Sequence, residues 1–176
     1  MRIISGTYKG KVINPGKNFT ARPTTDFAKE SLFNILANQY DFEELEVLDL
    51  FSGTGSISFE FASRASIYVE AVELNHKHAA FIGKTSRELK FNQIKIRNAN
   101  AFQYLKSCTR KFDIIFADPP YNMEGVETLP EIVLGKEILK PEGVFILEHS
   151  KKLNFFEHAH IVDHRDYGSV NFSFFK

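Results

Sequence analysis

The tetrapeptide Asp118-Pro119-Pro120-Tyr121 follows the apolar run of residues 112–117 and combines residue types that could hold an amine for reaction. Two consecutive prolines fix the backbone φ and remove two amide donors, so the local carbonyl groups are held in one direction. The Asp118 carboxylate and a backbone carbonyl can together accept both hydrogens of an exocyclic amine. The Tyr121 ring can stack on the face of the ring that carries this amine. The tetrapeptide therefore predicts chemistry at an exocyclic amino group.

A second candidate site lies in residues 47–55, where an apolar run carrying an acid opens into a two-glycine turn (Val-Leu-Asp-Leu-Phe-Ser-Gly-Thr-Gly). Gly53 and Gly55 allow positive φ and close approach of a ligand to the backbone. A turn of this kind lies where open α/β sheets bind ligands, outside the carboxyl ends of the strands. Glu73 ends the next apolar run and is placed to accept hydrogen bonds from ribose hydroxyls. The hypothesis is a nucleoside-containing cofactor.

The glycine loop alone leaves alternatives open. A dinucleotide site would carry a third glycine three positions after Gly55, where this chain has Ser58. Two glycines also occur in plain tight turns, so a turn without a ligand remains an alternative for this loop. A dinucleotide oxidoreductase also stays formally open, and binding of NAD would distinguish it. The tetrapeptide at residues 118–121 favours amine chemistry instead.

Strands and helices alternate along the chain from residue 47 onward, which is typical of an α/β fold with a mostly parallel sheet. The expected strands are residues 47–51, 67–73, 94–97, 112–117 and 144–148. The expected helices are residues 56–63, 76–90, 101–107 and 127–139. Residues 161–167 and 169–175 are expected to form an antiparallel pair at the end, with Val170, Phe172 and Phe174 on one face. We expect seven strands in the main sheet.

The beginning of the chain is expected to form an extension of the main domain. Residues 2–5 and 11–14 are expected to form a hairpin around a turn at residues 6–10. A helix should follow Thr24 or Thr25, with Asp26 in its first turn. Its inward face should consist of Ala28, Leu32, Ile35 and Leu36. We therefore expect an N-terminal extension in residues 1–40 and the main domain in residues 41–176.

Composition and charge narrow the class of protein. The chain has 176 residues, 43% of them hydrophobic, and a net charge of zero. It has no apolar run of membrane-span length and no long apolar region at its start, so we expect a cytoplasmic enzyme without a membrane segment. The single cysteine, Cys108, excludes an internal disulfide and a cysteine zinc site. His158, His160 and His164 have no completing cysteine or acid pattern, so no metal is expected.

The first thirty residues are basic, because six cations face only two acids there. Such a segment is typical of a nucleic-acid contact, but a solvated basic surface explains it equally well. The cations are Arg2, Lys9, Lys11, Lys17, Arg22 and Lys29.

At Asp118 to Tyr121 the chain resembles the amino-methyltransferases, whose motif is (Asn/Asp/Ser)-Pro-Pro-(Tyr/Phe/Trp). More closely it resembles the RsmD family, in five stretches that span nearly the whole chain. These are Met-Arg-Ile-Ile-Ser-Gly at the start, Arg-Pro-Thr-Thr-Asp at 22–26, Phe-Ser-Gly-Thr-Gly at 51–55, the tetrapeptide, and Tyr-Gly at 167–168. The resemblance implies a class I, Rossmann-like methyltransferase fold that binds S-adenosylmethionine. It also implies methylation of the exocyclic amine of one guanine in small-subunit (16S) ribosomal RNA, within a protein-bound assembly intermediate.

The resemblance also assigns roles to residues. Asp118 and the Pro119 carbonyl would hold the target amine, and Tyr121 would stack on the guanine. Asn100 stands where many methyltransferases have Asp, so its bond to the adenine amine depends on which way the amide faces. The implied cofactor-binding residues are Asp49, Phe51, Ser52, Gly53, Gly55, Glu73, Leu74, Asn100, Ala101 and Asp118. The implied substrate-binding residues are Arg2, Lys9, Lys11, Arg22, Thr24 and Tyr121.

The same amine clamp occurs in DNA-adenine and protein-glutamine methyltransferases, which remain the alternatives. DNA enzymes usually add a target-recognition region, and glutamine enzymes add a helical N-terminal domain. Only a hairpin and one helix precede the main domain here, which favours RNA. A binding module with a vestigial cofactor fold is disfavoured by the intact Asp49, Glu73 and Asp118. We expect a monomer.

Overall fold

The computed structural model describes residues 1–16, 25–168 and 170–176. In these residues seven strands form one sheet in the order β3-β2-β1-β4-β5-β7-β6. The first five strands along the chain pair in parallel, whereas β7 is antiparallel to both β5 and β6. The strands are β1 (Glu46–Leu50), β2 (Tyr68–Glu73), β3 (Ile94–Asn98), β4 (Phe112–Ala117), β5 (Leu139–His149), β6 (Ile161–Tyr167) and β7 (Val170–Phe175). The predicted fold class is confirmed.

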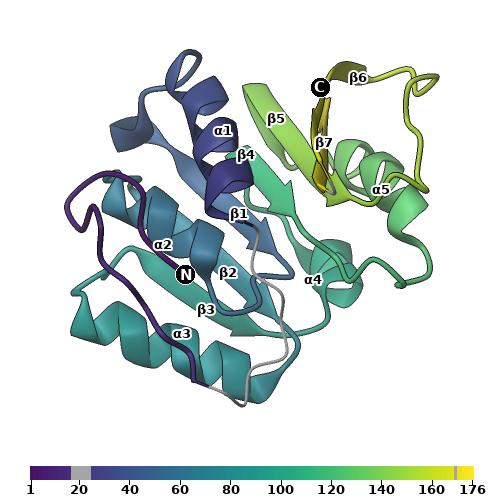
Figure 1. The fold of residues 1–176 in the computed structure, drawn as a ribbon. Helices are drawn as coiled ribbons and strands as arrows, with labels where there is room; N and C mark the ends of the chain where they lie inside the picture. The colour runs from purple at the N-terminus through teal and green to yellow at the C-terminus, as the bar shows by residue number, and fades with distance from the viewer. Residues whose placement is uncertain (17–24, 169) are drawn as a thin grey trace.

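Helices alternate with the strands and cover both faces of the sheet (Figure 1). They are α1 (Asp26–Ala37), α2 (Ser56–Ser63), α3 (His76–Glu88), α4 (Ala101–Ser107) and α5 (Leu129–Gly135), with short 3₁₀ turns at Phe42–Glu44 and Val126–Thr128. Thr25 caps α1 as expected, because its hydroxyl accepts a hydrogen bond of 3.2 Å from the Ala28 amide. None of the helices in the described ranges is long and apolar enough to cross a membrane.

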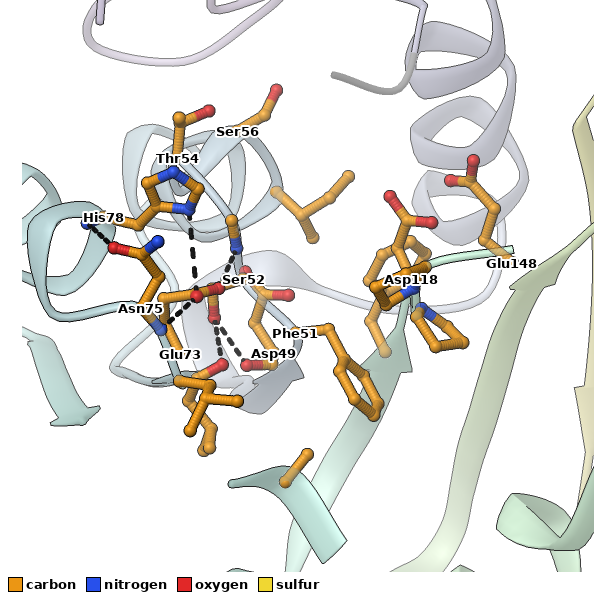
Figure 2. A pocket seen from close by; sticks show the side chains of 18 of the residues that line it. Asp49, Phe51, Ser52, Thr54, Ser56, Glu73, Asn75, His78, Asp118 and Glu148 are labelled. Carbon is orange, nitrogen blue, oxygen red and sulfur yellow. Dashed lines mark hydrogen bonds and ion pairs between the residues drawn. The ribbon is translucent and has the colours of Figure 1, made fainter. Parts of the chain in front are cut away.

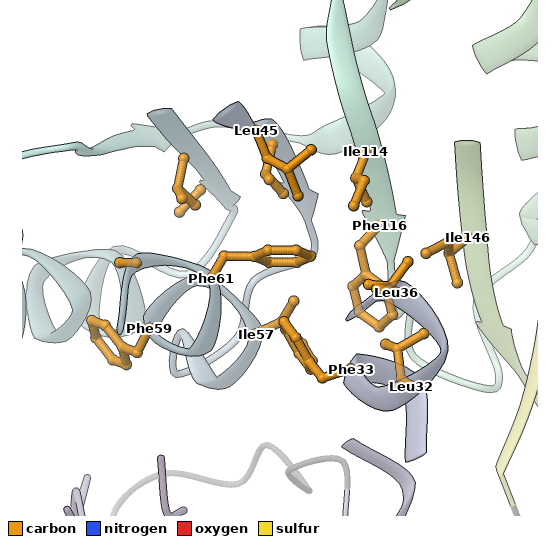
Figure 3. Packing of buried hydrophobic residues seen from close by; sticks show 14 of the residues in the cluster. Leu32, Phe33, Leu36, Leu45, Ile57, Phe59, Phe61, Ile114, Phe116 and Ile146 are labelled. Atoms are coloured by element: carbon orange, nitrogen blue, oxygen red, sulfur yellow. The ribbon is translucent and has the colours of Figure 1, made fainter. Parts of the chain in front are cut away.

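Two buried clusters hold these layers together, one on each face of the sheet. The cluster under α1, α2 and α3 is rich in phenylalanine, and Phe33, Phe61 and Phe116 meet in it (Figure 3). The opposite cluster joins α4 and α5 to the sheet. Along β1, Val47 enters the first cluster and Leu48 enters the second, so this strand is buried on both faces. Because α1 belongs to the first cluster, it packs directly on the sheet. The domain division at residues 40 and 41 stays a prediction.

The expected N-terminal hairpin is present as a short antiparallel pair around the bridge between Arg2 and Val12. The Ile3 amide donates to the Lys11 carbonyl and the Ile13 amide donates to the Met1 carbonyl, both at 2.9 Å. The pairing ends after Ile3, because the next two amides are bound outside the hairpin. The Ile4 and Ser5 amides donate to the carboxylate of Glu60, at 2.7 and 3.0 Å. The next amides along the segment donate to Ser63 at the end of α2. The segment is therefore fastened to α2 and does not form a regular two-stranded sheet.

The Glu60 carboxylate is fully buried and is the centre of a cationic network. Lys29 lies 3.9 Å from Glu60 Oε2, and Arg64 lies 2.9 Å from Glu60 Oε1. Lys29 is only 1% exposed, and it donates hydrogen bonds to the Arg2 carbonyl at 2.6 Å and to the Ser56 hydroxyl at 3.1 Å. Burial lowers the pKa of Lys29, against the opposing effect of Glu60. Grouping Lys29 with the surface cations of the N-terminus was therefore wrong.

The last third of the chain departs from the expected boundaries in two places. The expected helix at residues 127–139 ends at Gly135, because Leu139 already pairs with Phe112 at the start of β5. The strand expected at residues 144–148 begins earlier, at Leu139, and its register with β4 shifts between the pairs Phe112–Leu139 and Ile114–Val144. Strand β7 is buried on both faces, because β5 and β6 flank it and the two clusters cover it.

Replacing Glu60 with Ala should cost about 3 to 5 kcal/mol of unfolding free energy, because it leaves Lys29 buried without its carboxylate and two amides without an acceptor. Urea denaturation at neutral pH measures the change. Glu88→Ala is the matched control, since Glu88 forms an exposed pair with Lys84 on α3 and should cost about 0 to 1 kcal/mol. Equal losses in the two variants would contradict the network.

Candidate active site

A pocket of about 690 Å³ opens at the carboxyl ends of β1, β2, β4 and β5 (Figure 2). This volume lies in the range of pockets that bind small molecules and cofactors. Its wall includes the glycine loop, the end of β2, the start of α4 and the Asp-Pro-Pro-Tyr turn. The two motifs that were distant in sequence therefore share one cavity.

The glycine loop uses left-handed backbone at three positions, with φ of 59° at Phe51, 55° at Gly53 and 84° at Gly55. The Ser52 amide donates to the Val72 carbonyl at 3.0 Å, which ties the loop to β2. Gly53 lines the pocket, but Gly55 is absent from its wall. A Cβ atom at Gly55 would lie 3.0 Å from Ile82, so this glycine permits α2 to approach α3 closely. Gly55 therefore serves helix packing, and its contact with a cofactor stays a prediction.

Asp49 lies near the end of β1 and is buried under the loop while still lining the pocket. Its Oδ2 accepts hydrogen bonds from the Ser58 amide at 3.1 Å and from the Ser58 hydroxyl at 2.5 Å. Burial raises the pKa of Asp49 to about 7, although the Ser58 bonds favour the ionised form. Ser58 stands where a dinucleotide site would have its third glycine. Its hydroxyl holds the Asp49 carboxylate beside the glycine loop, which a glycine could not do.

Glu73 ends β2 and faces the pocket with a carboxylate fixed by the backbone. Its Oε2 accepts a hydrogen bond from the Gly53 amide at 2.8 Å, and its Oε1 accepts one from the Asn75 amide at 2.6 Å. His78 Nδ1 lies 3.8 Å from Oε1 and also lines the pocket. No motif in the sequence pointed to His78, which lies in the first turn of α3. Glu73 joins the glycine loop to the end of β2.

The far wall of the pocket contains three more of the predicted cofactor-binding residues, two of which, Asn100 and Ala101, were expected beside the adenine. Leu74, Asn100 and Ala101 all line it. Asn100 also caps α4, because its Oδ1 accepts a hydrogen bond of 3.1 Å from the Gln103 amide. The amide oxygen therefore faces the helix end, and any bond to a ligand would use its second lone pair. The adenine contact of Asn100 stays a prediction.

Asp118 follows β4 directly, and its amide donates to the Leu50 carbonyl at 3.4 Å. Asp118, Pro119 and Tyr121 line the pocket together. The Tyr121 side chain is 44% exposed, and its hydroxyl donates to Glu148 Oε1 at 3.3 Å. Glu148 lies near the end of β5 and is buried. Sequence reasoning missed it, although an acid that ends an apolar strand was the pattern that identified Glu73.

The expected substrate residues are not gathered at one place. Arg2 lies near the pocket, because its side chain pairs with Asp26 at 3.2 Å, next to the pocket-lining Thr25. Lys9 and Lys11 are exposed in the N-terminal segment that contacts the end of α2 (Figure 1). The pocket lies at the other end of this helix, and a helix of this length spans about 10 Å. Arg22 and Thr24 lie outside the described residues.

Within the ranges that the structure describes, His, Cys, Asp and Glu side chains form no group of three that could hold a metal ion. The acids of the pocket are held by backbone amides and hydroxyl groups.

The family model described as "Conserved hypothetical protein 95" matches residues 1–176. The chain is 32% identical over 155 residues to "Ribosomal RNA small subunit methyltransferase D" of Haemophilus influenzae, covering 86% of this chain and 79% of that protein. A protein of the same name from Buchnera aphidicola is 30% identical over 154 residues, covering 88% and 78%. These matches confirm the resemblance inferred from the motifs.

Solved structures agree with the fold. The putative methylase HI0767 from Haemophilus influenzae has a TM-score of 0.79 and 28% identity, covering 99% of this chain and 96% of that chain. A Thermus thermophilus 16S rRNA N2 G1207 methyltransferase, solved with AdoMet and guanosine, has a TM-score of 0.70 and 19% identity, covering 89% and 44%. The second likeness shows the class I methyltransferase fold alone. From the match over its whole length and from these relatives, the chain belongs to the Conserved hypothetical protein 95 family, which is the family of the small-subunit ribosomal RNA methyltransferases D.

Proposed function

We propose that this protein transfers a methyl group from S-adenosylmethionine to the exocyclic amine of a guanine in small-subunit (16S) ribosomal RNA. The observation that carries the proposal is the shared pocket, in which Asp118 and Tyr121 face the same cavity as the glycine loop and Glu73. An amine clamp and a nucleoside site in one cavity suit transfer between a nucleoside cofactor and a nucleobase. Relatives named as small-subunit ribosomal RNA methyltransferases support RNA as the substrate class.

The pocket fits the cofactor in both charge and shape. Glu73 lines the cavity, and two backbone amides hold its carboxylate where ribose hydroxyls can donate to it. Asp49 lies beside the loop, where its ionised form suits the ammonium group of a methionine moiety. Leu74 and Ala101 offer apolar contact to an adenine ring. When bound, the cofactor supplies a methyl group on a positively charged sulfur.

Catalysis by the chain itself consists mainly of positioning and charge stabilisation. Asp118 and the Pro119 carbonyl accept the two hydrogens of the amine, so the nitrogen lone pair points away from them and toward the methyl group. The nitrogen becomes positively charged as the new N–C bond forms, and the Asp118 carboxylate stabilises this charge. The methylated amine is acidic, so its proton can leave after the transfer. Asp118 therefore need not be a strong base.

The target guanine must leave any stacked or paired helix to enter the pocket. The Tyr121 ring, which is partly exposed at the pocket, is placed to stack on it. We propose that the physiological substrate is ribosomal RNA within a protein-bound assembly intermediate, modified in the cytoplasm by a monomer. Arg2, Lys9, Lys11, Arg22 and Thr24 remain the proposed RNA contacts. Methylation of DNA adenine or of protein glutamine remains the alternative.

The proposal is tested with small ribosomal subunits from cells that lack the family's enzyme. The purified protein and labelled S-adenosylmethionine should label the small-subunit RNA, and mapping should place N2-methylguanine at one position. Duplex DNA and release-factor protein serve as the competing substrates. Label in either of them, with none in the RNA, would overturn the proposal.

Replacing Glu73 with Ala should weaken cofactor binding by about 1 to 3 kcal/mol, the range for hydrogen bonds to a charged group. The change removes the ribose acceptor and also the acceptor of the Gly53 amide. Isothermal titration calorimetry measures the affinity. Glu73→Gln is the control, since it keeps one acceptor oxygen and should lose less. Wild-type affinity in Glu73→Ala would remove this residue from the cofactor site.

The raised pKa of Asp49 predicts how stability depends on pH. The folded state holds the Asp49 proton up to about pH 7, whereas the unfolded chain loses it near pH 4. Its stabilising contribution is therefore complete below pH 4 and is lost as the pH rises to 7. Asp49→Asn cannot ionise, so its unfolding free energy relative to wild type should rise from pH 4 to pH 7. Urea denaturation across this range checks it, and parallel profiles would contradict the buried titration.

Replacing Asp118 with Ala should remove most turnover on small subunits while cofactor affinity stays near wild type. The reason is that the lost interaction strengthens as positive charge develops on the nitrogen. Tyr121→Ala should lose about 1 to 3 kcal/mol of base stacking, and Tyr121→Phe should be mild because the ring remains. Single-turnover methylation and calorimetry separate the two steps. Wild-type turnover by Asp118→Ala would show that the amine-clamp mechanism is wrong.

A further inference from the structure

Glu148 lies beside Asp118 because of the register between their strands. Strands β4 and β5 run parallel, with Ala117 opposite Leu147, so Asp118 and Glu148 are the next pair at the carboxyl ends. Neighbouring strands are about 4.8 Å apart, which fixes the separation of the two backbones. Both side chains line the pocket, and Figure 2 shows their carboxylates directed to the same side of the sheet. The amine clamp therefore has a second acid at its side.

The Glu148 carboxylate is buried and is held in place by a hydrogen bond from within the pocket. The residue is only 3% exposed, and burying a carboxylate costs free energy unless hydrogen bonds compensate. One such bond comes from the Tyr121 hydroxyl at 3.3 Å, and this is the ring placed to stack on the base. A carboxylate offers about four lone-pair positions, so it can accept hydrogen bonds from several donors at once. Tyr121 thus orients Glu148 against the same base that it stacks on.

Guanine presents two kinds of donor side by side on its Watson–Crick edge, the ring N1–H and the exocyclic amine. Two adjacent carboxylates match this edge, because an ionised carboxylate only accepts hydrogen bonds. Adenine carries an acceptor at N1 next to its amine, so an acid facing N1 would meet a lone pair without a hydrogen. A glutamine side chain has no counterpart of the N1–H group.

We infer that Glu148 is a specificity-determining residue that accepts the N1–H of the target guanine while Asp118 holds its amine. The inference rests on the proposed function and names the group of the substrate that the same pocket reads. Selection of guanine then follows from the strand register that sets two acids side by side. A site that rewards a buried hydrogen bond rejects an analogue lacking the donor strongly, because the acceptor is left unpaired.

The test uses small subunits reconstituted with either guanine or 2-aminopurine at the mapped position. 2-Aminopurine keeps the exocyclic amine but has an acceptor at N1. Wild-type protein should methylate the 2-aminopurine subunits with kcat/KM at least tenfold lower than the guanine subunits. Equal rates on the two would overturn the role of Glu148 without any variant. If wild type methylates neither, while labelling DNA or protein, the proposed function itself has failed.

The variant Glu148→Gln supplies a second readout, since its amide can donate to an acceptor at N1. It should lose activity on guanine and should shift the guanine to 2-aminopurine ratio by tenfold or more toward 2-aminopurine. Cofactor affinity by calorimetry should stay at the wild-type value, which a merely structural role would not preserve. Glu142→Gln, an exposed acid on the same strand, is the matched control and should keep the wild-type ratio. An unchanged ratio in Glu148→Gln, with the cofactor bound normally, would overturn the inference.

Discussion

Parallel pairing of β2, β1, β4 and β5 is the constraint on which the site depends. Each of these strands brings one acid to the same edge of the sheet: Asp49, Glu73, Asp118 and Glu148. Parallel strands end at a common edge, so residues separated by a hundred positions meet without any long-range motif. Like charges at this edge repel one another. Hydrogen-bond donors offset this repulsion, among them Ser58, the Gly53 amide and Tyr121. The result is a pocket lined by four acids, which suits the positively charged cofactor S-adenosylmethionine.

Buried charges, and not pairing with a strand of the main sheet, hold the N-terminal segment beside the pocket. Glu60 draws the segment onto α2, and Lys29 links α1 to the Arg2 carbonyl. Lys29 also bonds the hydroxyl of Ser56, which begins α2 and lines the pocket. Lys29 therefore joins the start of the chain to the residue that follows the glycine loop. Because two cations and two backbone amides share one carboxylate, the arrangement is sensitive to the loss of any single partner.

Local patterns were sufficient for the elements and for the two motifs. Short apolar runs that end in glycine or an acid predicted β1, β2 and β4, since a strand buried on both faces has to be apolar throughout. The Thr25 cap with Asp26 predicted the start of α1 correctly. The hairpin is shorter than expected, because the Ile4 and Ser5 amides bind Glu60, which lies far along the chain. The pattern of residues 2–14 contains no sign that Glu60 would bind these two amides.

The sequence by itself determined the fold class and pointed to the glycine loop and to the proposed amine clamp, because each depends on residue types that are adjacent in the chain. Only the tertiary structure decided which other side chains join them. The sequence suggested that Lys29 is a surface cation, but packing of α1 buries it. The register of β4 with β5 alone sets Glu148 beside Asp118. The close packing of α2 on α3 at Gly55 is likewise visible only in the assembled structure. Burial and strand register are properties of the assembled sheet, so no local stretch of residues encodes them.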